Sequence, residues 1–366
     1  MKILFLSNHF ITLYSFRKEL IKRLIEDGHE VYLSIPKSDE NSYFSNMGCK
    51  IVETSVDRRG INPFKDFYLL CKYVKIMKGI IPDIIFSYTI KPNIYGSIAS
   101  NITKRIQVNN ITGTGATFLK ESFVSRLVIL LYKISVKNSW MVFFQNSGDK
   151  DFFIDHKMIR DNYIVLPGSG VNLEQYSATD MPSGSEINFI FIGRIMKLKG
   201  IEEYLSCAEI LKGRYSNVNF YIAGFIEEDK YKKIIKEYSN QGIIKYIGFQ
   251  KDIKTWIQKC HCTVLPSHGG EGIPNVLLES AAMGRACIAS NINGSNDVIT
   301  DGVTGYLFET GSRGDLSVKL EQFIQLSNNE RNQMGQLGRE KVERQFDRRF
   351  VIEAYIEELE KVKTLE

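Results

Sequence analysis

Two glutamates stand eight positions apart in the stretch HGGEGIPNVLLE, residues 268–279. Glu271 follows a Gly-Gly pair, and Glu279 lies in an apolar run after Pro274. Pro274 suits the first turn of a helix, where its missing N–H costs nothing. The backbone N–H groups of residues 272–276 would then form an anion site at the positive end of the helix dipole. Because carboxylates accept hydrogen bonds from hydroxyl groups, the stretch predicts a ligand that carries both phosphate and hydroxyls. By itself, Glu279 is more typical of a helix surface than of a ligand site.

A second group of charged residues lies in FIGRIMKLKG, residues 191–200. A predicted strand ends at Gly193, and Arg194 and Lys199 follow it five positions apart. We expect both cations at the same sheet edge as the glycine loop, where they would suit a diphosphate. The alternative is two unrelated surface bases. Glycines in the neighbouring loop would let a ligand approach the backbone closely: Gly269, Gly270 and Gly272.

Strands that alternate with helices must position these loops. Apolar runs of strand length separated by helical spacing imply parallel sheets covered on both faces, and ligands bind beyond the carboxyl ends of such strands. The residues around 169–186 are small and polar and contain Pro and Gly, so we place a domain linker there. The sequence therefore predicts an α/β protein of two Rossmann-like, doubly wound domains that face a central cleft. Expected strands are 3–7, 31–35, 83–87, 107–111, 141–145, 163–166, 187–193, 218–224, 244–248, 262–266 and 286–290, with second-half helices near 200–213, 228–240, 251–259 and 274–284.

Composition excludes several classes of protein. The chain has 366 residues, 43% of them hydrophobic, which is enough for two cores. Its six cysteines do not form two CxxC pairs, and Cys260-His261-Cys262 has the wrong spacing for a zinc knuckle, so no metal is expected. The N-terminus MKILFLSNHF reads as a strand rather than a signal peptide. The longest apolar stretch, Leu127–Val136, is interrupted by Lys133 and is too short to span a bilayer, which predicts a soluble or peripheral protein.

Positive charge is concentrated in the first half. Residues 1–167 carry 23 Lys and Arg against 15 Asp and Glu, a net charge of +8, and residues 168–366 carry 24 against 27, a net charge of −3. The basic half suggests an anionic partner, namely membrane lipid, phosphate or nucleic acid, or simply a solvated face. No known nucleic-acid module is recognisable, so we expect no nucleic-acid partner.

The segment 62–81 is a predicted helix that is both aromatic and basic. It either packs on the sheet only or also rests on anionic lipid through its lysines and a tyrosine. The expected core stripe is Phe67, Leu70, Val74 and Met77, with Lys65, Lys72 and Lys75 off that stripe and Tyr68 or Tyr73 as the tyrosine at the lipid.

The two charged groups together resemble a known family. Glu271-x7-Glu279 on a strand–loop–helix, preceded by Arg194-x4-Lys199, is similar to the donor half of the retaining glycosyltransferases of family 4, which have the GT-B fold. Most similar are bacterial members that extend undecaprenyl-diphosphate-linked glycans in O-antigen, capsule or protein-glycan assembly. Further stretches that carry the resemblance are Ser15-Phe16-Arg17, Arg58-Arg59 followed by Asn62-Pro63-Phe64, GVNLEQY at 170–176 and NGSNDVITDGVTGYLF at 293–308.

The resemblance implies a role for each matching residue. Arg194 and Lys199 would bind the donor diphosphate and stabilise the leaving nucleotide. Glu279 would hold the ribose hydroxyls, and Glu271 would orient the donor sugar. The remaining donor-site candidates are Gly193, Gly272, Ile273, Pro274 and Asn275. Residues 1–167 with a C-terminal helix at 348–366 would bind the acceptor, and residues 168–347 would bind the nucleotide-sugar.

The general base is the point at which the sequence departs from the family. Many relatives carry a histidine near the position of VNNITGTGATF, residues 108–118, and this stretch has none. The leaving phosphate can accept the acceptor's proton in retaining transfer, and His9 is an alternative base. Arg17, Gly113 and Gly115 are the other acceptor-side candidates.

The resemblance implies transfer of a hexose or N-acetylhexosamine from a nucleotide-sugar, expected to be UDP-linked, to a lipid-diphosphate-linked glycan. Neither a cofactor nor a metal is expected, and the enzyme would be cytoplasmic, peripheral on the inner face of the membrane. Two other functions stay open at this point: a sugar-nucleotide 2-epimerase of the same architecture, and a non-catalytic sugar-nucleotide-binding protein.

Overall fold

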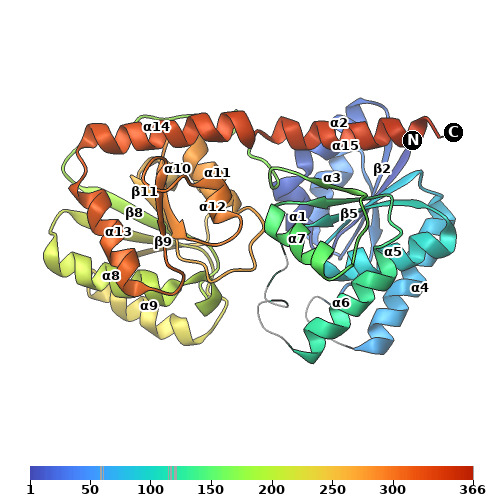
Figure 1. Cartoon of the computed structure of the whole chain (residues 1–366), viewed down its shortest axis with the longest axis horizontal. Coiled ribbons are helices and arrows are strands. Elements are labelled where there is room, and N and C mark those ends of the chain that lie inside the picture. Colours follow the sequence, from blue (N-terminus) through green and yellow to red (C-terminus); the bar gives the residue numbers. More distant parts are fainter. Residues whose placement is uncertain (58–59, 61, 114, 116–117, 119–121, 366) are drawn as a thin grey trace. The chain divides into compact units, whose positions relative to one another are not determined.

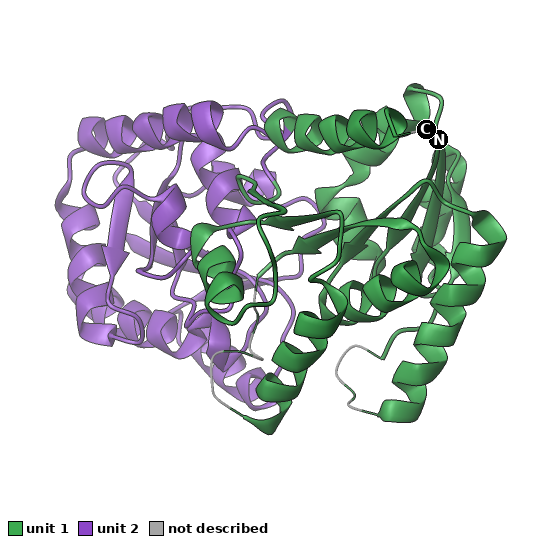
Figure 2. Cartoon of the chain, turned by 45° about the vertical axis from the view of Figure 1, so that its right-hand side comes forward, with its two compact units in different colours: residues 1–169, 349–366 green, residues 170–348 purple. Residues whose placement is uncertain are grey.

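The computed structural model describes residues 1–57, 60, 62–113, 115, 118 and 122–365. The chain forms two compact units, unit 1 (Met1–Ser169 with Arg349–Glu366) and unit 2 (Gly170–Arg348), coloured separately in Figure 2. The expected boundaries fell one or two residues earlier, after residues 167 and 347. Arg58, Arg59 and Thr114, which belonged to expected motifs, lie outside the described residues.

Unit 1 is a doubly wound α/β structure (Figure 1). Within its described residues the strands form a seven-stranded parallel sheet in the order β3-β2-β1-β4-β5-β6-β7. The strands are β1 (Lys2–Leu6), β2 (Glu30–Ile35), β3 (Lys50–Glu53), β4 (Ile84–Tyr88), β5 (Ile106–Ile111), β6 (Met141–Phe144) and β7 (Tyr163–Val165). The helices are α1 (Phe10–Phe16), α2 (Lys18–Glu26), the short 3-10 helix η1 (Asp39–Asn41), α3 (Ser42–Met47), α4 (Pro63–Ile80), α5 (Ile90–Thr103), α6 (Phe123–Ser135), α7 (Ser147–Asp155) and α15 (Arg348–Lys363).

Alternation along the strands of unit 1 builds two cores. Successive side chains of a strand point to opposite faces of the sheet. Ile3 and Phe5 therefore pack with α1, α2, α3 and the C-terminal helix α15. Leu4 and Leu6 pack on the other face, beneath α4 and α5, and the core under α6 and α7 continues that face. Strands buried on both faces explain why the sequence reads as continuous apolar runs.

The expected core stripe of α4 is confirmed only in part, since Met77 is buried and Leu70 and Val74 pack against the same core, but Phe67 does not. Phe67 is 67% exposed, and the residues that α4 buries are Leu69, Tyr73, Ile76 and Met77. The helix is apolar on more than one side, so periodicity alone does not decide which side meets the sheet. Burial of Tyr73, which is fully buried, also removes it from the residues that could touch a membrane, whereas Tyr68 is exposed.

Unit 2 repeats the architecture. Its described strands form a six-stranded parallel sheet in the order β10-β9-β8-β11-β12-β13. The strands are β8 (Ile187–Ile192), β9 (Val218–Ala223), β10 (Lys245–Gly248), β11 (Cys262–Leu265), β12 (Ala286–Ser290) and β13 (Gly305–Phe308). The helices are the 3-10 helix η2 (Lys197–Lys199), α8 (Ile201–Arg214), α9 (Lys230–Asn240), α10 (Lys254–Gln258), α11 (Asn275–Ala282), α12 (Ser295–Val298), α13 (Arg313–Gln325) and α14 (Asn328–Gln345).

The core of unit 2 is also divided by its sheet. One face packs with α8, α9 and α13, and the other packs with α11, α12 and α14, while α10 contributes to a smaller cluster. The two-domain, doubly wound prediction is confirmed. The sequence analysis missed β3 and β13, which are edge strands with several partly exposed residues, and apolar runs do not mark such strands. No helix among the described residues has the length and apolarity to cross a bilayer.

Candidate active site

The two predicted charged loops of unit 2 meet at the carboxyl edge of its sheet. Strand β8 and strand β11 are parallel neighbours, so the segments that follow them leave at the same edge. The turn after β8 touches the loop after β11 so closely that a Cβ on Gly200 would lie 1.8 Å from the Pro266 carbonyl oxygen. The backbone N–H of His268 donates to the Leu198 carbonyl at 2.9 Å. Only glycine allows this contact, which brings the two loops together.

Lys199 and Glu271 form an ion pair across these loops. The Lys199 Nζ donates to Glu271 Oε1, and each side chain is only 17% exposed. Buried Ser267 donates from its Oγ to the same carboxylate oxygen at 2.8 Å. In this partly dehydrated position each charge compensates the other, because an unpaired charge would be costly. A ligand that takes either group as its partner must therefore replace the other group.

Arg194 is held more loosely than Lys199. Its Nη1 lies 3.7 Å from Glu227 Oε1, and its side chain is 41% exposed. A guanidinium in this position can turn toward an anion with little desolvation cost. The structure thus places one cation, Lys199, inside the loop contact and the other, Arg194, at its solvent-facing side.

Glu279 lies half-buried on α11, and Tyr176 is its partner. Burial of the Tyr176 hydroxyl, together with the nearby Glu279 carboxylate that accepts its hydrogen bond, raises the pKa of Tyr176. Tyr176 belongs to the GVNLEQY stretch, so the sequence pointed to this segment but assigned no role to the tyrosine. The contact helps to fix the position of the Glu279 carboxylate.

The start of α11 supplies further polar groups. Pro274 is the residue just before the helix, one position earlier than expected, and its carbonyl accepts from Leu277 N at 3.1 Å. Asn275 is the first residue of α11, and among the described residues its buried Oδ1 has no hydrogen-bond partner. Ile273 is 5% exposed and packs in the core, so only its backbone can serve a ligand. An orphaned buried acceptor at a helix start is typical of a ligand site.

Glycines shape the loop before α11. Gly269 and Gly270 have φ values of +128° and +72°, which side chains rarely adopt. A Cβ on Gly294 would lie 1.8 Å from the Gly272 carbonyl oxygen, so the loop of residues 293–308 packs directly on the glycine loop. Gly193 has no such constraint, since its added Cβ would meet only Phe191 at 3.8 Å.

Ser267 and His268, to which the sequence analysis assigned no role, hold the glycine loop in place. Ser267 holds the Glu271 carboxylate, and its spacing of four residues from Glu271 is the only sequence signal for that role. His268 Nε2 lies 3.3 Å from Glu203 Oε2, and Glu203 is buried in the first turn of α8. Both side chains link the glycine loop to the segment that carries Lys199.

The acceptor-side candidates in unit 1 have mainly structural contacts. His9 is the N-cap of α1, and its Nδ1 accepts from Ile11 N at 3.1 Å. Arg17 is only 2% exposed, so in this structure its charge serves contacts within unit 1, and its acceptor role stays a prediction. Its Nε donates to the Tyr355 hydroxyl of α15 at 3.0 Å. Gly113 and Gly115 have φ values of +116° and +67°, as glycine permits.

The described residues contain no group of three or more His, Cys, Asp or Glu side chains that could hold an ion. His261 is buried, its Nδ1 accepts from Asn188 N at 3.1 Å, and burial lowers its pKa to about 4. Cys260 and Cys262 are free, buried thiols whose pKa values burial raises. These three residues are packing groups of unit 2.

Known proteins match both units. Residues 2–146 match the family Glycosyl transferase 4-like, and residues 180–341 match Glycosyl transferases group 1. The N,N'-diacetylbacillosaminyl-diphospho-undecaprenol alpha-1,3-N-acetylgalactosaminyltransferase of Campylobacter jejuni is 27% identical over 345 residues, covering 89% of this chain and 90% of the relative. The capsular polysaccharide biosynthesis glycosyltransferase CapM of Staphylococcus aureus is 26% identical over 316 residues, covering 81% of each chain.

Solved structures share the fold. The crystal structure of Anabaena HepE in complex with UDP and glucose superimposes with a TM-score of 0.79 at 18% identity, and the match covers 99% of this chain and 100% of that chain. Such a likeness supports the GT-B arrangement of two doubly wound domains. With family matches to both units and the paired charged loops of unit 2, the chain belongs to the glycosyltransferases, with a 4-like domain in unit 1 and a group 1 domain in unit 2.

Proposed function

We propose that this chain is a retaining glycosyltransferase of family 4 that moves a hexose or N-acetylhexosamine from a UDP-sugar to a lipid-diphosphate-linked glycan in surface polysaccharide synthesis. The observation that carries the proposal is the contact between the two charged loops, in which Lys199 meets Glu271 at the carboxyl edge of a Rossmann-like sheet. Diphosphate and sugar hydroxyls are the groups that such a cation and such a carboxylate recognise. Unit 2 would bind the donor, and unit 1 would bind the acceptor.

The proposed reaction exchanges one C–O bond for another. The bond between the sugar C1 and the donor diphosphate breaks, and C1 forms a bond with the acceptor hydroxyl oxygen on the same face of the ring. The acceptor proton passes to the departing phosphate oxygen. Lys199 and Arg194 would stabilise the negative charge that grows on the diphosphate. Glu271 would orient the sugar, and Glu279, with Tyr176, would hold the ribose.

Binding of the donor would rearrange the Lys199–Glu271 ion pair. The diphosphate would take over Lys199, and the released Glu271 carboxylate would accept hydrogen bonds from sugar hydroxyls. Ser267 would keep the carboxylate in place during this exchange, because its Oγ contact does not involve Lys199. The same cation thus neutralises Glu271 before binding and the leaving group afterwards, and no metal ion is required in this scheme.

The acceptor class rests on the Campylobacter relative, whose name states an undecaprenol-diphosphate acceptor. The test is a panel of UDP- and GDP-sugars incubated with synthetic undecaprenyl-diphosphate saccharides, with products separated by mass and the anomeric configuration read by NMR. We expect transfer from one UDP-sugar with retention. Transfer with inversion would refute the retaining mechanism. Epimerisation of the donor without acceptor would indicate the epimerase instead, and binding without turnover would indicate a non-catalytic protein.

A lipid-linked acceptor requires that unit 1 reach a membrane surface, and we propose that α6 lies on it. The exposed positions of α6 share one helical face and combine large apolar with basic side chains. Residues 122–148 contain no Asp or Glu. The exposed positions along this face are Phe123, Arg126, Leu130, Lys133, Ile134 and, just beyond the helix, Lys137.

The helix α4 was the first expectation for this surface, and it is less suitable. Lys65 pairs with Asp57 at 3.1 Å, and the Lys72 Nζ donates to the Glu53 carbonyl at 2.6 Å. Two of the four lysines of α4 therefore already have partners. Phe64 and Phe67 at its start are exposed and could still add apolar contact.

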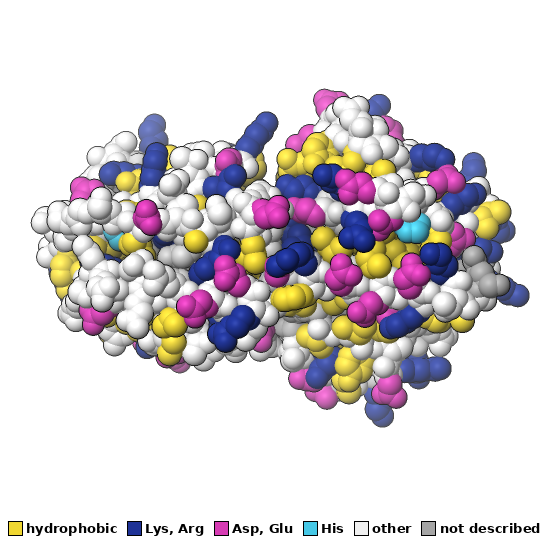
Figure 3. Space-filling view, turned by 90° about the horizontal axis from the view of Figure 1, so that it is seen from above, with side chains coloured by type: hydrophobic (Ala, Val, Ile, Leu, Met, Phe, Trp, Pro, Cys, Tyr) yellow, Lys and Arg dark blue, Asp and Glu magenta, His cyan; other side chains and the backbone are white. Residues whose placement is uncertain are grey.

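The opposite face of unit 1 is unsuited to anionic lipid. It carries α15, whose outward positions include Glu353, Glu357 and Glu360. Figure 3 looks onto α14 and α15 and shows acidic and basic side chains mixed along this side of the chain. Acidic side chains are thus present on the face with α15, whereas residues 122–148, which include α6, contain none.

Co-sedimentation with vesicles tests the membrane proposal. Each basic residue near an anionic surface contributes about 1 kcal/mol, which salt reduces. Phe123→Ser with Lys133→Glu should lower binding to phosphatidylglycerol vesicles several-fold and leave hydrolysis of the UDP-sugar unchanged. The matched control is Phe64→Ser with Lys75→Glu on α4, which should have the smaller effect. Equal losses in both pairs, or none in either, would contradict the assignment of α6.

A further inference from the structure

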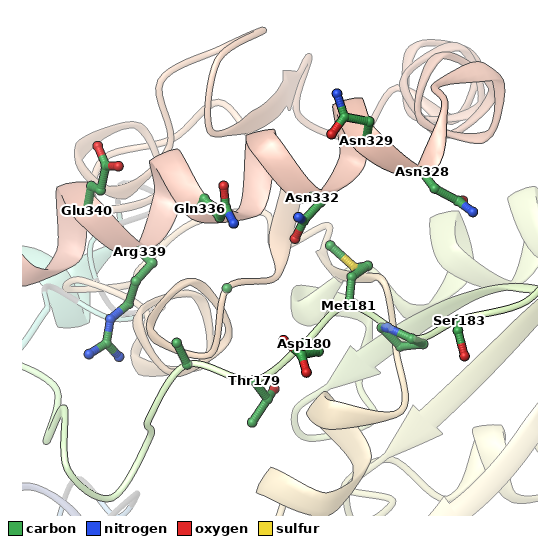
Figure 4. Close-up of a pocket in the computed structure, with 13 residues that line it drawn as sticks. Thr179, Asp180, Met181, Ser183, Asn328, Asn329, Asn332, Gln336, Arg339 and Glu340 are labelled. Atoms are coloured by element: carbon green, nitrogen blue, oxygen red, sulfur yellow. The ribbon is translucent and has the colours of Figure 1, made fainter.

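Unit 2 carries a second concavity, which we call the amide pocket. It has a volume of about 730 Å³ and is bordered by residues 178–183, Gly284 and one side of α14 (Figure 4). Residues 178–183 lead into β8 and Gly284 leads into β12, so the amide pocket lies at the amino ends of the strands. The candidate active site lies at their carboxyl ends. A strand of five or six residues separates the two edges by roughly 15–20 Å.

Buried side chains fix the first wall of the amide pocket. Arg285 is 1% exposed, and its Nη1 donates to the Thr179 carbonyl at 2.9 Å. Its Nη2 donates to Thr179 Oγ1 and to the Asp180 carbonyl, each at 2.7 Å. The buried ring of His261 also bonds the Pro182 backbone. A segment without regular secondary structure is therefore held in one conformation, which lowers the entropic cost of binding a ligand.

Helix α14 forms the second wall and presents a row of amides. Asn328, Asn332, Gln336 and Glu340 recur every four residues, which places them on one side of the helix. In Figure 4, Asn332 projects from α14 toward Met181. The helix packs directly on the turn at the pocket floor, since a Cβ on Gly335 would lie 2.1 Å from the Gly284 carbonyl oxygen.

The amides in the middle of this row are available to a ligand. Asn328 Oδ1 already accepts from Arg331 Nη2 at 2.6 Å. Across the described part of the chain, no hydrogen bond involves the side-chain amides of Asn332 and Gln336. Each amide offers two donors and an acceptor, and a saccharide hydroxyl both donates and accepts.

The charge of the amide pocket disfavours an anionic ligand. Arg339 is compensated, because its Nε pairs with Glu343 at 2.5 Å and its Nη1 donates to the Tyr176 carbonyl at 2.8 Å. Exposed carboxylates of Asp180 and Glu340 remain at the rim. A nucleotide or phosphate would face these acids without a free cation. Met181 and Pro182 add apolar surface on which the C–H face of a sugar ring can rest.

We propose that the amide pocket binds a neutral mono- or disaccharide, at a site separate from the donor and acceptor sites proposed above. The lining of the amide pocket fits a polyhydroxylated, uncharged ligand. It offers a row of amide side chains, a fixed polar wall and a small apolar surface, and its described lining residues include no uncompensated cation. The volume lies in the range of about 300–1,000 Å³ that is usual for small-molecule sites. A saccharide held there is remote from the proposed reacting atoms and is therefore not a substrate of the transfer.

Methyl NMR on the full chain tests this proposal, because Met181 lies in the amide pocket. The protein is labelled at its methionine methyl groups, and Met181→Leu identifies the signal of Met181. The probes are N,N'-diacetylchitobiose and maltose, and UDP is the anionic probe. We expect at least one saccharide to shift the Met181 signal saturably at millimolar concentration, while UDP leaves the signal in place.

Substitutions on α14 provide the matched comparison. Loss of hydrogen bonds from Asn332→Ala with Gln336→Ala should weaken saccharide binding about tenfold. Gln333→Ala, at an exposed position of the same helix outside the pocket, should have no effect. Both variants should bind UDP like the parent protein, which separates a failure here from a failure of the proposed donor site. A Met181 signal that no saccharide moves, or that moves equally in the double variant, would overturn the proposal.

Discussion

The two sheets share one architecture, but they use the polar residues at their carboxyl edges differently. In unit 2 the charged side chains Lys199 and Glu271 pair across two loops and stay partly exposed. In unit 1 the comparable charged side chain is Arg17, which is buried beneath α15 and donates a hydrogen bond to the Tyr355 hydroxyl. A ligand can exchange with the first pair without unfolding anything, whereas the second contact holds two distant parts of the chain together.

The core of unit 1 also contains polar side chains that hydrogen-bond one another. Ser87, Asn93 and Asn109 hydrogen-bond one another beneath α5. The network reaches α15 through Asn110, whose carbonyl accepts from Asn93 at 2.9 Å and whose Oδ1 accepts from the Tyr355 hydroxyl. Buried polar networks that are satisfied internally fix one packing arrangement. The exposed surface that unit 1 offers to partners therefore lies on helices such as α6, and not on its polar core.

Removal of the cation in unit 2 should have the largest effect. Lys199→Ala deletes a charge that faces the departing diphosphate, and loss of one such group costs about 3 kcal/mol, roughly a hundredfold in turnover. Lys236→Ala on α9, an exposed lysine of the same unit, is the control and should leave turnover unchanged. Steady-state rates with the productive UDP-sugar test this prediction, on variants whose circular dichroism matches that of the parent protein. Near-parent turnover of Lys199→Ala would remove Lys199 from the site.

Substitution of Arg17, which is buried in unit 1, should mainly lower the free energy of unfolding. Arg17→Met removes charge-assisted hydrogen bonds to Tyr355 and to the Phe16 carbonyl, so the free energy of unfolding should fall by about 2–3 kcal/mol. Urea unfolding followed by circular dichroism measures this change. Arg23→Met is the control, because Arg23 pairs with Asp27 on the surface and such pairs contribute about 0–1 kcal/mol. A variant of Arg17 that unfolds like the parent but has lost turnover would instead assign Arg17 to the acceptor site.

Loss of the Tyr176–Glu279 contact should have a smaller effect, on the binding of UDP. Tyr176→Phe removes one hydrogen bond to the Glu279 carboxylate, which is worth about 1 kcal/mol, or roughly fivefold in the Kd for UDP. Glu279→Gln should weaken UDP binding at least as much. Because ribose contacts are alike before and during the reaction, kcat should change little in either variant. Titration calorimetry measures the Kd, and a lower kcat with an unchanged Kd would contradict the ribose assignment.

Chelation of divalent metal ions should have the smallest effect and leave turnover unchanged. In the proposed scheme Lys199 and Arg194 supply the charge that a metal ion would otherwise provide to the diphosphate. Turnover in excess EDTA should therefore equal turnover in buffer. Turnover that disappears in EDTA and returns with Mn²⁺ or Mg²⁺ would show that an ion neutralises the leaving group, and the two cations would then have a secondary role.

Local sequence determined much of the fold and the composition of the site. Continuous apolar runs of strand length predicted most strands, since a strand buried on both faces has no polar positions. Glycines at 269 and 270 predicted a loop that other residues rarely form, and both have positive φ. The spacing of Arg194, Lys199, Glu271 and Glu279 predicted chemistry suited to a sugar nucleotide, because strand ends of one parallel sheet share an edge. Each of these features can be read within a short stretch of the sequence.

Only the tertiary structure decided which charges pair and which polar residues are structural. Lys199 and Glu271 are 72 positions apart, and Arg17 and Tyr355 are 338 positions apart. The burial of Arg17 depends on where α15 returns to the first unit, and the packing side of α4 depends on which of its apolar sides meets the sheet. His9 became a helix cap because α1 begins directly after it. Local spacing carries no information about such contacts, since each depends on the free energy of packing segments that are distant in the chain.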